Sequence, residues 1–456
     1  MYLIQKKFTM KKVLIFIGLF SSGLLFQSCG NQVDNKAKSE AALPVEWSKN
    51  AVIYEVNVRQ YTEEGTFKAF EAELPRLKEL GVDILWFMPI FPIGLENRKG
   101  SLGSYYSIQD YSAVNPEFGT MEDMQSIIEK AHDLGLYVIL DWVANHSAWD
   151  HAWVTEHPEY YKKDSTGVMV SPFDWTDVVA FDYSNTDMRE AMKNEMLFWV
   201  RDMDVDGFRC DVAGEVPTDF WENTRVELDK VKPVFMLAEA EKAELVNKAF
   251  DMDYGWHQHH LMNEIAKGNI NANDMNAYFD ELDELYPERS YKMYFTTNHD
   301  ENSWNGTVGE RLGDAADVLS VLSFTVGDMP LIYNGQESAL NKRLLFFEKD
   351  LIDWDGYSKT DFFKKLTSLK HTQKALNSGS YGERFVRIPS SADEQIFAFD
   401  RGNVRVLLNL STEEVNFNLE NTDFEGYNTY MENGFEGDFA LNEMKLSAWG
   451  YVVLIN

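Results

Sequence analysis

The sequence has little cysteine and few basic residues. Two cysteines, Cys29 and Cys210, stand in 456 residues, which is too few to build a disulfide framework. The 42 lysines and arginines are far outnumbered by 74 aspartates and glutamates, so the formal net charge is −32. Because such a charge repels phosphate groups, we expect no binding to nucleic acid and favour a neutral substrate. We find neither an internal repeat nor a low-complexity segment.

The N-terminus has the composition of a processing segment. Several lysines precede an apolar run at residues 13–26, which is too short to span a bilayer comfortably, and Cys29 follows it. The pattern resembles a bacterial lipoprotein signal, which implies a signal peptide at residues 1–28, lipidation of Cys29 and a polar tether at residues 29–45. We expect an exported protein, lipid-anchored to a bacterial membrane on its periplasmic or cell-surface side. A cleaved soluble signal and an uncleaved anchor are the alternatives.

Short apolar runs alternate with longer amphipathic stretches over residues 46–377. The runs predict eight strands, at residues 51–58, 82–90, 136–143, 206–213, 234–240, 249–256, 292–300 and 329–337. Continuous apolar strands separated by helices are typical of a parallel sheet covered by helices. Eight such units predict an α/β fold, a closed (β/α)8 TIM barrel, with a doubly wound open sheet as the alternative.

The connections and the C-terminus add to this barrel. Residues 66–81 and 121–135 each have helical apolar periodicity and end at a glycine. The connection after the third strand, about residues 147–187, is long and rich in aromatic residues, so we expect a functional insertion there. Alternating, turn-punctuated runs at residues 378–456 predict a C-terminal antiparallel β-sandwich domain.

Polar side chains interrupt the predicted strands near their carboxyl ends. They are Asp141 in the third strand, Arg209 and Asp211 in the fourth, Glu239 in the fifth, and Asn298, His299 and Asp300 in the seventh. Because residues i and i+2 of a strand project to the same side, Arg209 and Asp211 point together, while Cys210 points away as a buried, inert thiol. The carboxyl ends of barrel strands form one mouth, so these groups should converge there. Each acid alone has a structural alternative, since acids often cap the next helix.

Six segments together resemble one known family. "DWVANH" (141–146), "GFRCDVAG" (207–214), "LAEA" (237–240) and "TTNHDEN" (296–302) resemble, in order, the four sequence regions of the α-amylase family of glycoside hydrolases. Residues 104–120 and 331–337 resemble its second- and eighth-strand segments. The resemblance spans about residues 46–456. It implies a retaining enzyme that cleaves α-glucosidic bonds of starch-like glucans or maltooligosaccharides such as maltodextrins.

The resemblance also implies catalytic roles. It identifies Asp211 as the nucleophile and Glu239 as the acid/base, a pair that retaining glycosidases hold about 5–5.5 Å apart. Arg209 is expected to keep Asp211 ionised by lowering its pKa, whereas burial and like charge should raise the pKa of Glu239. Asp300 matches the third acid of the family, and Asp141 is expected to support the site from behind, through Arg209.

Further positions match substrate- and metal-binding residues of the family. His146 and His299 match histidines that donate hydrogen bonds to the sugar, and Tyr106 matches the aromatic residue on which that sugar stacks. Asn145 matches the asparagine that begins the usual structural calcium site, but Ala180 stands where calcium-binding members carry an aspartate. No cofactor is therefore implied as a requirement, and a structural calcium ion stays open.

Other departures from the family leave the specificity open. Glu215 stands four residues after Asp211, where many α-amylases have a histidine, and the histidine-rich residues 256–260 favour a solvated loop over a metal site. A transglycosylase, an α-1,6- or exo-acting α-glucosidase, and a catalytically inactive glycan-binding lipoprotein are the alternatives. The presence of Asp211, Glu239 and Asp300 together argues against an inactive glycan-binding protein. The sequence predicts no oligomeric state.

Overall fold

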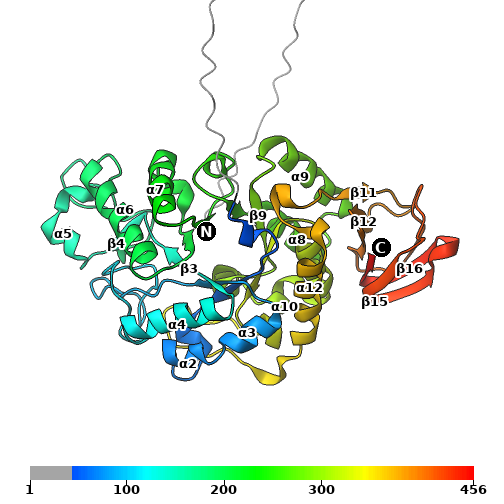
Figure 1. Cartoon of the computed structure of the whole chain (residues 1–456), viewed down its shortest axis with the longest axis horizontal. Helices are drawn as coiled ribbons and strands as arrows, with labels where there is room; N and C mark the ends of the chain where they lie inside the picture. The colour runs from blue at the N-terminus through cyan, green and yellow to red at the C-terminus, as the bar shows by residue number, and fades with distance from the viewer. Residues whose placement is uncertain (1–43) are drawn as a thin grey trace, which may run out of the picture. The chain divides into compact units, whose positions relative to one another are not determined.

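Eight parallel strands close into a barrel in the computed structural model, which describes residues 44–456. Their order around the barrel is β1-β10-β9-β8-β7-β6-β3-β2 (Figure 1). The strands are β1 (Ile53–Val56), β2 (Ile84–Phe87), β3 (Tyr137–Trp142), β6 (Gly207–Cys210), β7 (Phe235–Ala238), β8 (Met252–Tyr254), β9 (Tyr291–Tyr294) and β10 (Met329–Tyr333). The predicted TIM barrel is confirmed, and the alternative of an open sheet is wrong because β1 pairs with both β2 and β10.

The predictions for the N-terminus lie outside the described residues. These are the signal peptide at residues 1–28, the lipidated Cys29 and nearly all of the tether at residues 29–45. Among the helices of residues 44–456, none combines the length and the apolar character that a membrane span requires.

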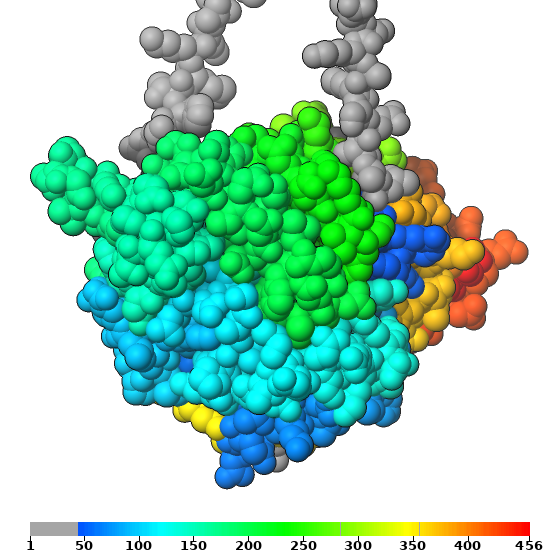
Figure 2. All heavy atoms as spheres, turned by 60° about the vertical axis from the view of Figure 1, so that its left-hand side comes forward, coloured from blue at the N-terminus to red at the C-terminus, as the bar shows by residue number. Residues whose placement is uncertain are grey.

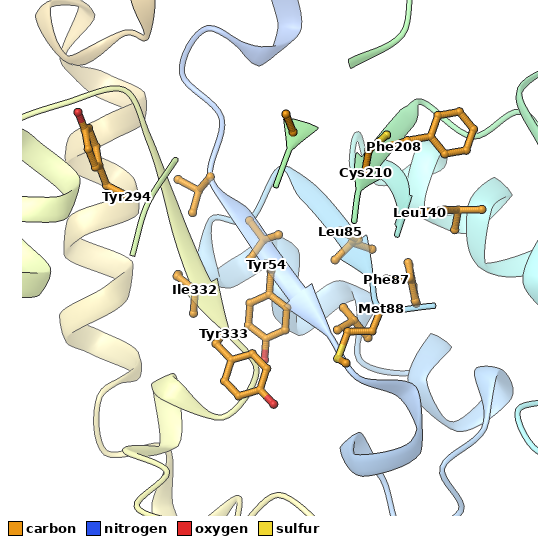
Figure 3. Close-up of a cluster of buried hydrophobic side chains, with 14 of the residues drawn as sticks. Tyr54, Leu85, Phe87, Met88, Leu140, Phe208, Cys210, Tyr294, Ile332 and Tyr333 are labelled. Atoms are coloured by element: carbon orange, nitrogen blue, oxygen red, sulfur yellow. The ribbon is translucent and has the colours of Figure 1, made fainter. Parts of the chain in front are cut away.

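Alternate residues of each strand pack on opposite faces of the barrel wall. In β2, Trp86 belongs to the apolar cluster inside the barrel, whereas Leu85 and Phe87 join the layer between the strands and the helices. Figure 3 shows part of that outer layer, including Cys210 of β6. The side chain of Arg209, one residue earlier, therefore points into the barrel, where its guanidinium lies over the Trp86 ring.

The helices surround the barrel, and one departs from its prediction. They are α1 (Val58–Tyr61), α2 (Phe67–Glu71), α3 (Leu74–Leu80), α4 (Met121–Asp133), α6 (Thr186–Arg201), α7 (Thr218–Val231), α8 (Trp256–Ala266), α9 (Ala272–Leu285), α10 (Val308–Leu312), α11 (Ala316–Thr325) and α12 (Thr360–Thr372). Residues 66–81 form two helices instead of one. Pro75 lies in the first turn of α3, where its missing N–H costs nothing, whereas within a longer helix it would leave a carbonyl unpaired.

The connection after β3 forms a small unit of its own. Strands β4 (His146–Ala148) and β5 (Val178–Ala180) pair antiparallel, and helix α5 (Ala152–Glu156) lies between them in the sequence. The unit packs onto the barrel helices through Tyr183, whose ring contacts Phe220 of α7. The space-filling view shows its residues at the surface beside those of α6 and α7 (Figure 2).

The C-terminal domain is antiparallel, as predicted, with its strands joined in one sheet. They are β11 (Val386–Ile388), β12 (Ile396–Arg401), β13 (Val404–Asn409), β14 (Val415–Phe417), β15 (Asn428–Asp438) and β16 (Glu443–Ile455). Strand β16 is long enough to pair with β14 near its start and with β13 near its end. One face of the sheet joins the hydrophobic layer of the barrel helices, and the other encloses a separate cluster.

Candidate active site

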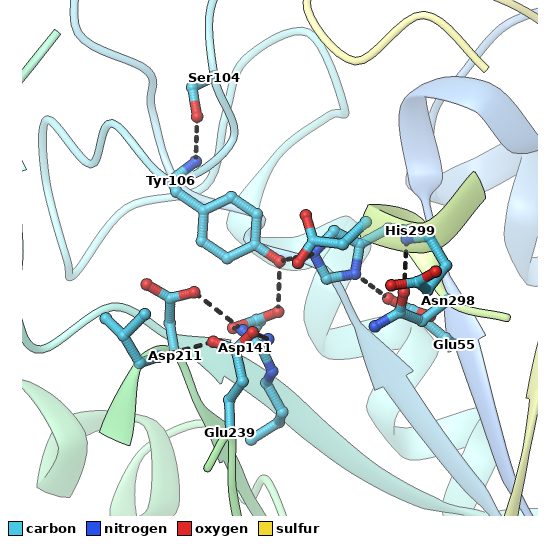
Figure 4. A network of polar contacts seen from close by, with 12 residues as sticks. Glu55, Ser104, Tyr106, Asp141, Asp211, Glu239, Asn298 and His299 are labelled. Carbon is cyan, nitrogen blue, oxygen red and sulfur yellow. Dashed lines mark hydrogen bonds and ion pairs between the residues drawn. The ribbon is translucent and has the colours of Figure 1, made fainter. Parts of the chain in front are cut away.

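The structure brings the predicted acids together at one end of the barrel. Asp141 lies within β3, Asp211 directly after β6, Glu239 directly after β7, and Asp300 follows β9. All four strands reach this mouth with their carboxyl ends, because the barrel is parallel. Figure 4 shows the resulting network of polar contacts.

Arg209 is the centre of this network. It is fully buried, and its Nη1 lies 2.8 Å from Asp141 Oδ1 and 3.1 Å from Asp211 Oδ1. Its Nη2 lies 3.0 Å from Glu239 Oε1, and its Nε donates to the hydroxyl of Tyr254 at 3.1 Å. One guanidinium therefore holds three carboxylates in place. Asp141 contacts Arg209 and the hydroxyl of Tyr106, as expected of a supporting residue.

The backbone between the two predicted catalytic acids is strained. Val212 has φ 37°, a left-handed conformation that is costly for a β-branched residue. In this conformation its N–H donates to Glu239 Oε2 at 2.7 Å. The turn after β6 thus orients Asp211 and Glu239 together.

Burial raises the pKa of both of these carboxyl groups. For Asp211 the charge of Glu239 raises the pKa further, and Arg209 lowers it by less. The expectation that Arg209 gives Asp211 a lowered pKa is therefore wrong in its net direction, since burial and the neighbouring acid outweigh the guanidinium. The pKa of Glu239 is raised, as expected, by burial and then, despite Arg209, by Asp300. The pair consequently favours retaining a proton, which an acid catalyst requires.

His299 forms the other half of the site and has a partner that the sequence analysis missed. Its Nδ1 contacts Glu55 Oε1, and its Nε2 lies 2.8 Å from the Tyr106 hydroxyl and 3.5 Å from Asp300 Oδ2. Burial alone would lower the pKa of His299, but the charges of Asp300 and Glu55 raise it to about 9. Glu55 is a carboxylate in the middle of a buried strand, "IYEV", and that was the available signal.

We predict that Glu55→Gln lowers the upper pH limit of activity. The change removes the negative charge of Glu55 that lies beside His299, so the pKa of His299 should fall. The alkaline limb of kcat/KM should then move to lower pH by about one unit or more. Asp300 still raises the pKa, while Arg209 lowers it. The stabilisation from the pair is complete below the pKa of an unfolded histidine, about 6.5, and disappears as the pH rises through about 9.

Two controls accompany the Glu55 test. Glu55→Asp keeps the charge and should keep the alkaline limb near its original pH. Thermal unfolding of each variant separates a change in pH dependence from a loss of folded protein. An alkaline limb that stays in place in folded Glu55→Gln would contradict the role of Glu55.

Tyr106 connects the two halves of the site. Its hydroxyl donates to Asp141 Oδ2 at 2.9 Å, and its ring stacks on that of His299. Only 9% of Tyr106 is exposed. The structure thus places the predicted stacking residue against the predicted acids.

His146 and Asn145 lie at the start of the insertion. Burial lowers the pKa of His146 to about 3, so the imidazole is neutral, and it lies against the backbone of Tyr106. Asn145 Nδ2 lies 3.2 Å from Nδ1 of His146. Ala180 of β5 pairs with His146 of β4. Within residues 44–456, no group of three or more histidine, cysteine, aspartate or glutamate side chains is arranged to hold a metal ion.

The structure places the histidine-rich segment in a helix and Glu215 at the surface. Residues 256–260 open helix α8, so the prediction of a solvated loop is wrong. His259 is buried against Phe295 and lies 3.2 Å from Arg311 Nη1, which makes it a core residue. Glu215 is exposed, in a short 3-10 turn after Asp211.

The fold and this cluster of acids at a barrel mouth define a class of barrel glycosidase. The family model for the α-amylase catalytic domain matches residues 36–177 and 172–378, and the chain belongs to that family. α-Amylase MalA of Haloarcula japonica is 28% identical over 397 residues, which are 82% of this chain. The chain spans 57% of the length of that relative.

Two further relatives complete the comparison. The crystal structure of a maltogenic α-amylase, AmyB of Thermotoga neapolitana, superposes with a TM-score of 0.75 at 31% identity, covering 90% of this chain and 97% of that one. An α-1,4-glucan:maltose-1-phosphate maltosyltransferase of Cereibacter sphaeroides is 32% identical over 304 residues, 60% of this chain and 48% of that protein.

Proposed function

We propose that this protein hydrolyses α-glucosidic bonds of starch-like glucans or maltodextrins with net retention. The observation that carries the proposal is the shared contact of Asp211 and Glu239 with Arg209 at the barrel mouth. Retaining glycosidases need two neighbouring carboxyl groups, one to attack and one to protonate. Membership of the α-amylase family supports the choice of an α-glucan.

Each residue then has a defined role in the reaction. Glu239 gives its proton to the glycosidic oxygen while Asp211 attacks the anomeric carbon, so the bond to the leaving sugar breaks and a glycosyl ester forms. Glu239, now ionised, takes a proton from water, and the resulting hydroxide displaces Asp211 from that carbon. The two inversions restore the α-configuration.

The remaining residues bind the sugar at which cleavage occurs. Asp300 and His299 would hydrogen-bond its ring hydroxyls, and His146 would donate to it as a neutral imidazole. Tyr106 offers a ring face for stacking. In these roles Asp300 stabilises the positively charged transition state, since its carboxylate lies close enough to influence both Asp211 and Glu239.

The configuration of the first product tests this proposal. We expect maltoheptaose to give products whose new reducing ends are initially α by NMR, before mutarotation. Parallel incubations with pullulan and panose distinguish α-1,4 from α-1,6 cleavage. Initially β products would contradict a retaining mechanism on this substrate, and an absence of cleavage would favour the inactive glycan-binding alternative.

Transfer to a second sugar is the other candidate activity. The similarity to a maltosyltransferase supports it, because the same glycosyl ester can react with a sugar hydroxyl in place of water. Products longer than the starting maltoheptaose would identify transfer.

We propose further that the protein is anchored to a bacterial membrane by a lipidated Cys29. The position of this cysteine after an apolar run supports the proposal. We expect Cys29→Ala to release a soluble, still active enzyme, because stable anchoring needs more than one acyl chain and all would be lost. Membrane fractionation and mass spectrometry of the N-terminus measure this. A mature N-terminus downstream of Cys29 would contradict it.

A further inference from the structure

A half-exposed tryptophan stands next to the acids at the barrel mouth. Trp304 is 52% exposed, although tryptophan has the largest apolar side chain of any residue type. It lies on the π-helical turn Glu301–Asn305, which begins at Asp300. A π-helical turn brings residues four to five apart onto one side. Trp304 therefore rises from the same side of the turn as Asp300, a predicted catalytic acid.

Aromatic rings connect Trp304 with the site. Its ring centroid lies 5.3 Å from that of Phe346 and 5.8 Å from that of Phe347, both on the loop after β10. Phe346 in turn lies almost parallel to Tyr106, with an interplanar angle of 10° and centroids 6.2 Å apart. Ring contacts thus connect the exposed Trp304 with Tyr106, whose hydroxyl contacts Asp141 and His299.

Hydrogen bonds hold these rings in position. Asn302 is buried on the same turn as Trp304, and its side chain donates to the carbonyl of Lys342 at 3.0 Å and accepts from the N–H of Leu344 at 2.8 Å. The N–H of Leu102 donates to the carbonyl of Phe347 at 3.1 Å. Three separate loops are therefore joined at this rim, so little ordering is left to occur when a ligand binds.

A purely structural role does not account for the exposure of Trp304. Phe346 and Phe347 are partly buried and contact each other, and Phe346 also contacts Tyr105, so covering them does not require a ring of which half stays in water. The C–H face of a glucosyl ring is apolar and flat, and it can stack on an exposed aromatic ring such as that of Trp304 while the sugar hydroxyls remain solvated. This contact needs no charged partner.

We propose that Trp304, supported by Phe346 and Phe347, forms an additional sugar-binding platform that accepts a glucosyl unit of the substrate beyond the one being cleaved. The platform favours α-glucan oligosaccharides over single glucosides, because Tyr106 and Trp304 both contact Phe346 and only a substrate with further glucosyl units can contact both rings. This inference rests on the proposed α-glucan substrate.

Binding without turnover tests the platform independently of catalysis. In the Asp211→Asn background, calorimetry with maltoheptaose should give a Kd about tenfold higher when Trp304→Ala is added, which corresponds to about 1.4 kcal/mol. Trp304→Phe keeps a flat ring and should restore most of the affinity. Leu441→Ala removes an apolar side chain that is also exposed, but in the C-terminal domain, and should leave the Kd unchanged.

A kinetic ratio adds a second readout. In the otherwise unmodified enzyme, Trp304→Ala should lower kcat/KM for maltoheptaose about tenfold more than for an aryl α-glucoside. Equal losses on both substrates, or an unchanged Kd in folded protein, would overturn the platform and leave the proposed hydrolysis standing. Failure of Asp211→Asn to bind maltoheptaose at all would overturn both.

Discussion

Asp211→Asn is expected to lower kcat by about four orders of magnitude on every glucoside substrate, whatever its leaving group. The amide cannot form the glycosyl ester, so both steps of the reaction are lost together. At about 1.4 kcal/mol for each factor of ten, the loss corresponds to more than about 5 kcal/mol of transition-state stabilisation. Steady-state and single-turnover kinetics on maltoheptaose and on α-glucosyl fluoride measure it.

A matched substitution shows whether the loss is specific. Asp219→Asn makes the same chemical change at an exposed residue of α7, paired with Arg189, and should leave kcat unchanged. Asp211→Asn itself should stay folded, since Arg209 retains its contacts with Asp141 and Glu239. Near-normal turnover in Asp211→Asn would exclude Asp211 as the nucleophile.

Glu239→Ala is expected to discriminate between substrates by their leaving groups. Removing the acid should lower the activity on maltodextrin by at least about 100-fold, because a sugar alkoxide leaves poorly without a proton. Fluoride needs no such help, so α-glucosyl fluoride should still form the ester with Asp211. Azide can then attack the anomeric carbon of this β-linked ester and displace the Asp211 carboxylate, which inverts that carbon a second time and yields α-glucosyl azide.

The azide product separates the two carboxylates. α-Glucosyl azide, identified by NMR, is expected from Glu239→Ala and from neither Asp211→Asn nor the unmodified enzyme. A β-configured azide from Glu239→Ala would indicate a single direct displacement, with no covalent intermediate before the attack. Uniform losses on maltodextrin and on the fluoride would count against Glu239 as the acid.

Strand geometry explains why much of this site was predictable. Arg209 lies in β6 and Asp211 directly after it, two residues along, so the period of a strand places them on one side, which the contact of 3.1 Å bears out. The eight strands were recognisable because parallel strands are buried on both faces and therefore read as continuous apolar runs.

What escaped prediction depends on contacts distant in the sequence. The partner of His299 is Glu55, 244 residues earlier, and no local pattern connects the two. The pKa of Asp211 depends on the depth of burial and on the position of Glu239, which only the closed barrel determines. The aromatic rim likewise combines three loops that are separate in the sequence.

The closure of the barrel by β1 and β10 has a consequence for biosynthesis. β1 leaves the ribosome before the other barrel strands, yet one of its two neighbours ends only at Tyr333. Until then β1 and β9 each present an unpaired edge, a state open to wrong pairing and aggregation. The buried carboxylate of Glu55 also lacks its partner until His299 has been synthesised. A nascent chain interrupted before residue 333 would therefore depend on chaperones to stay soluble. A chain that includes residue 333 can close its barrel and assemble its active site in the same step.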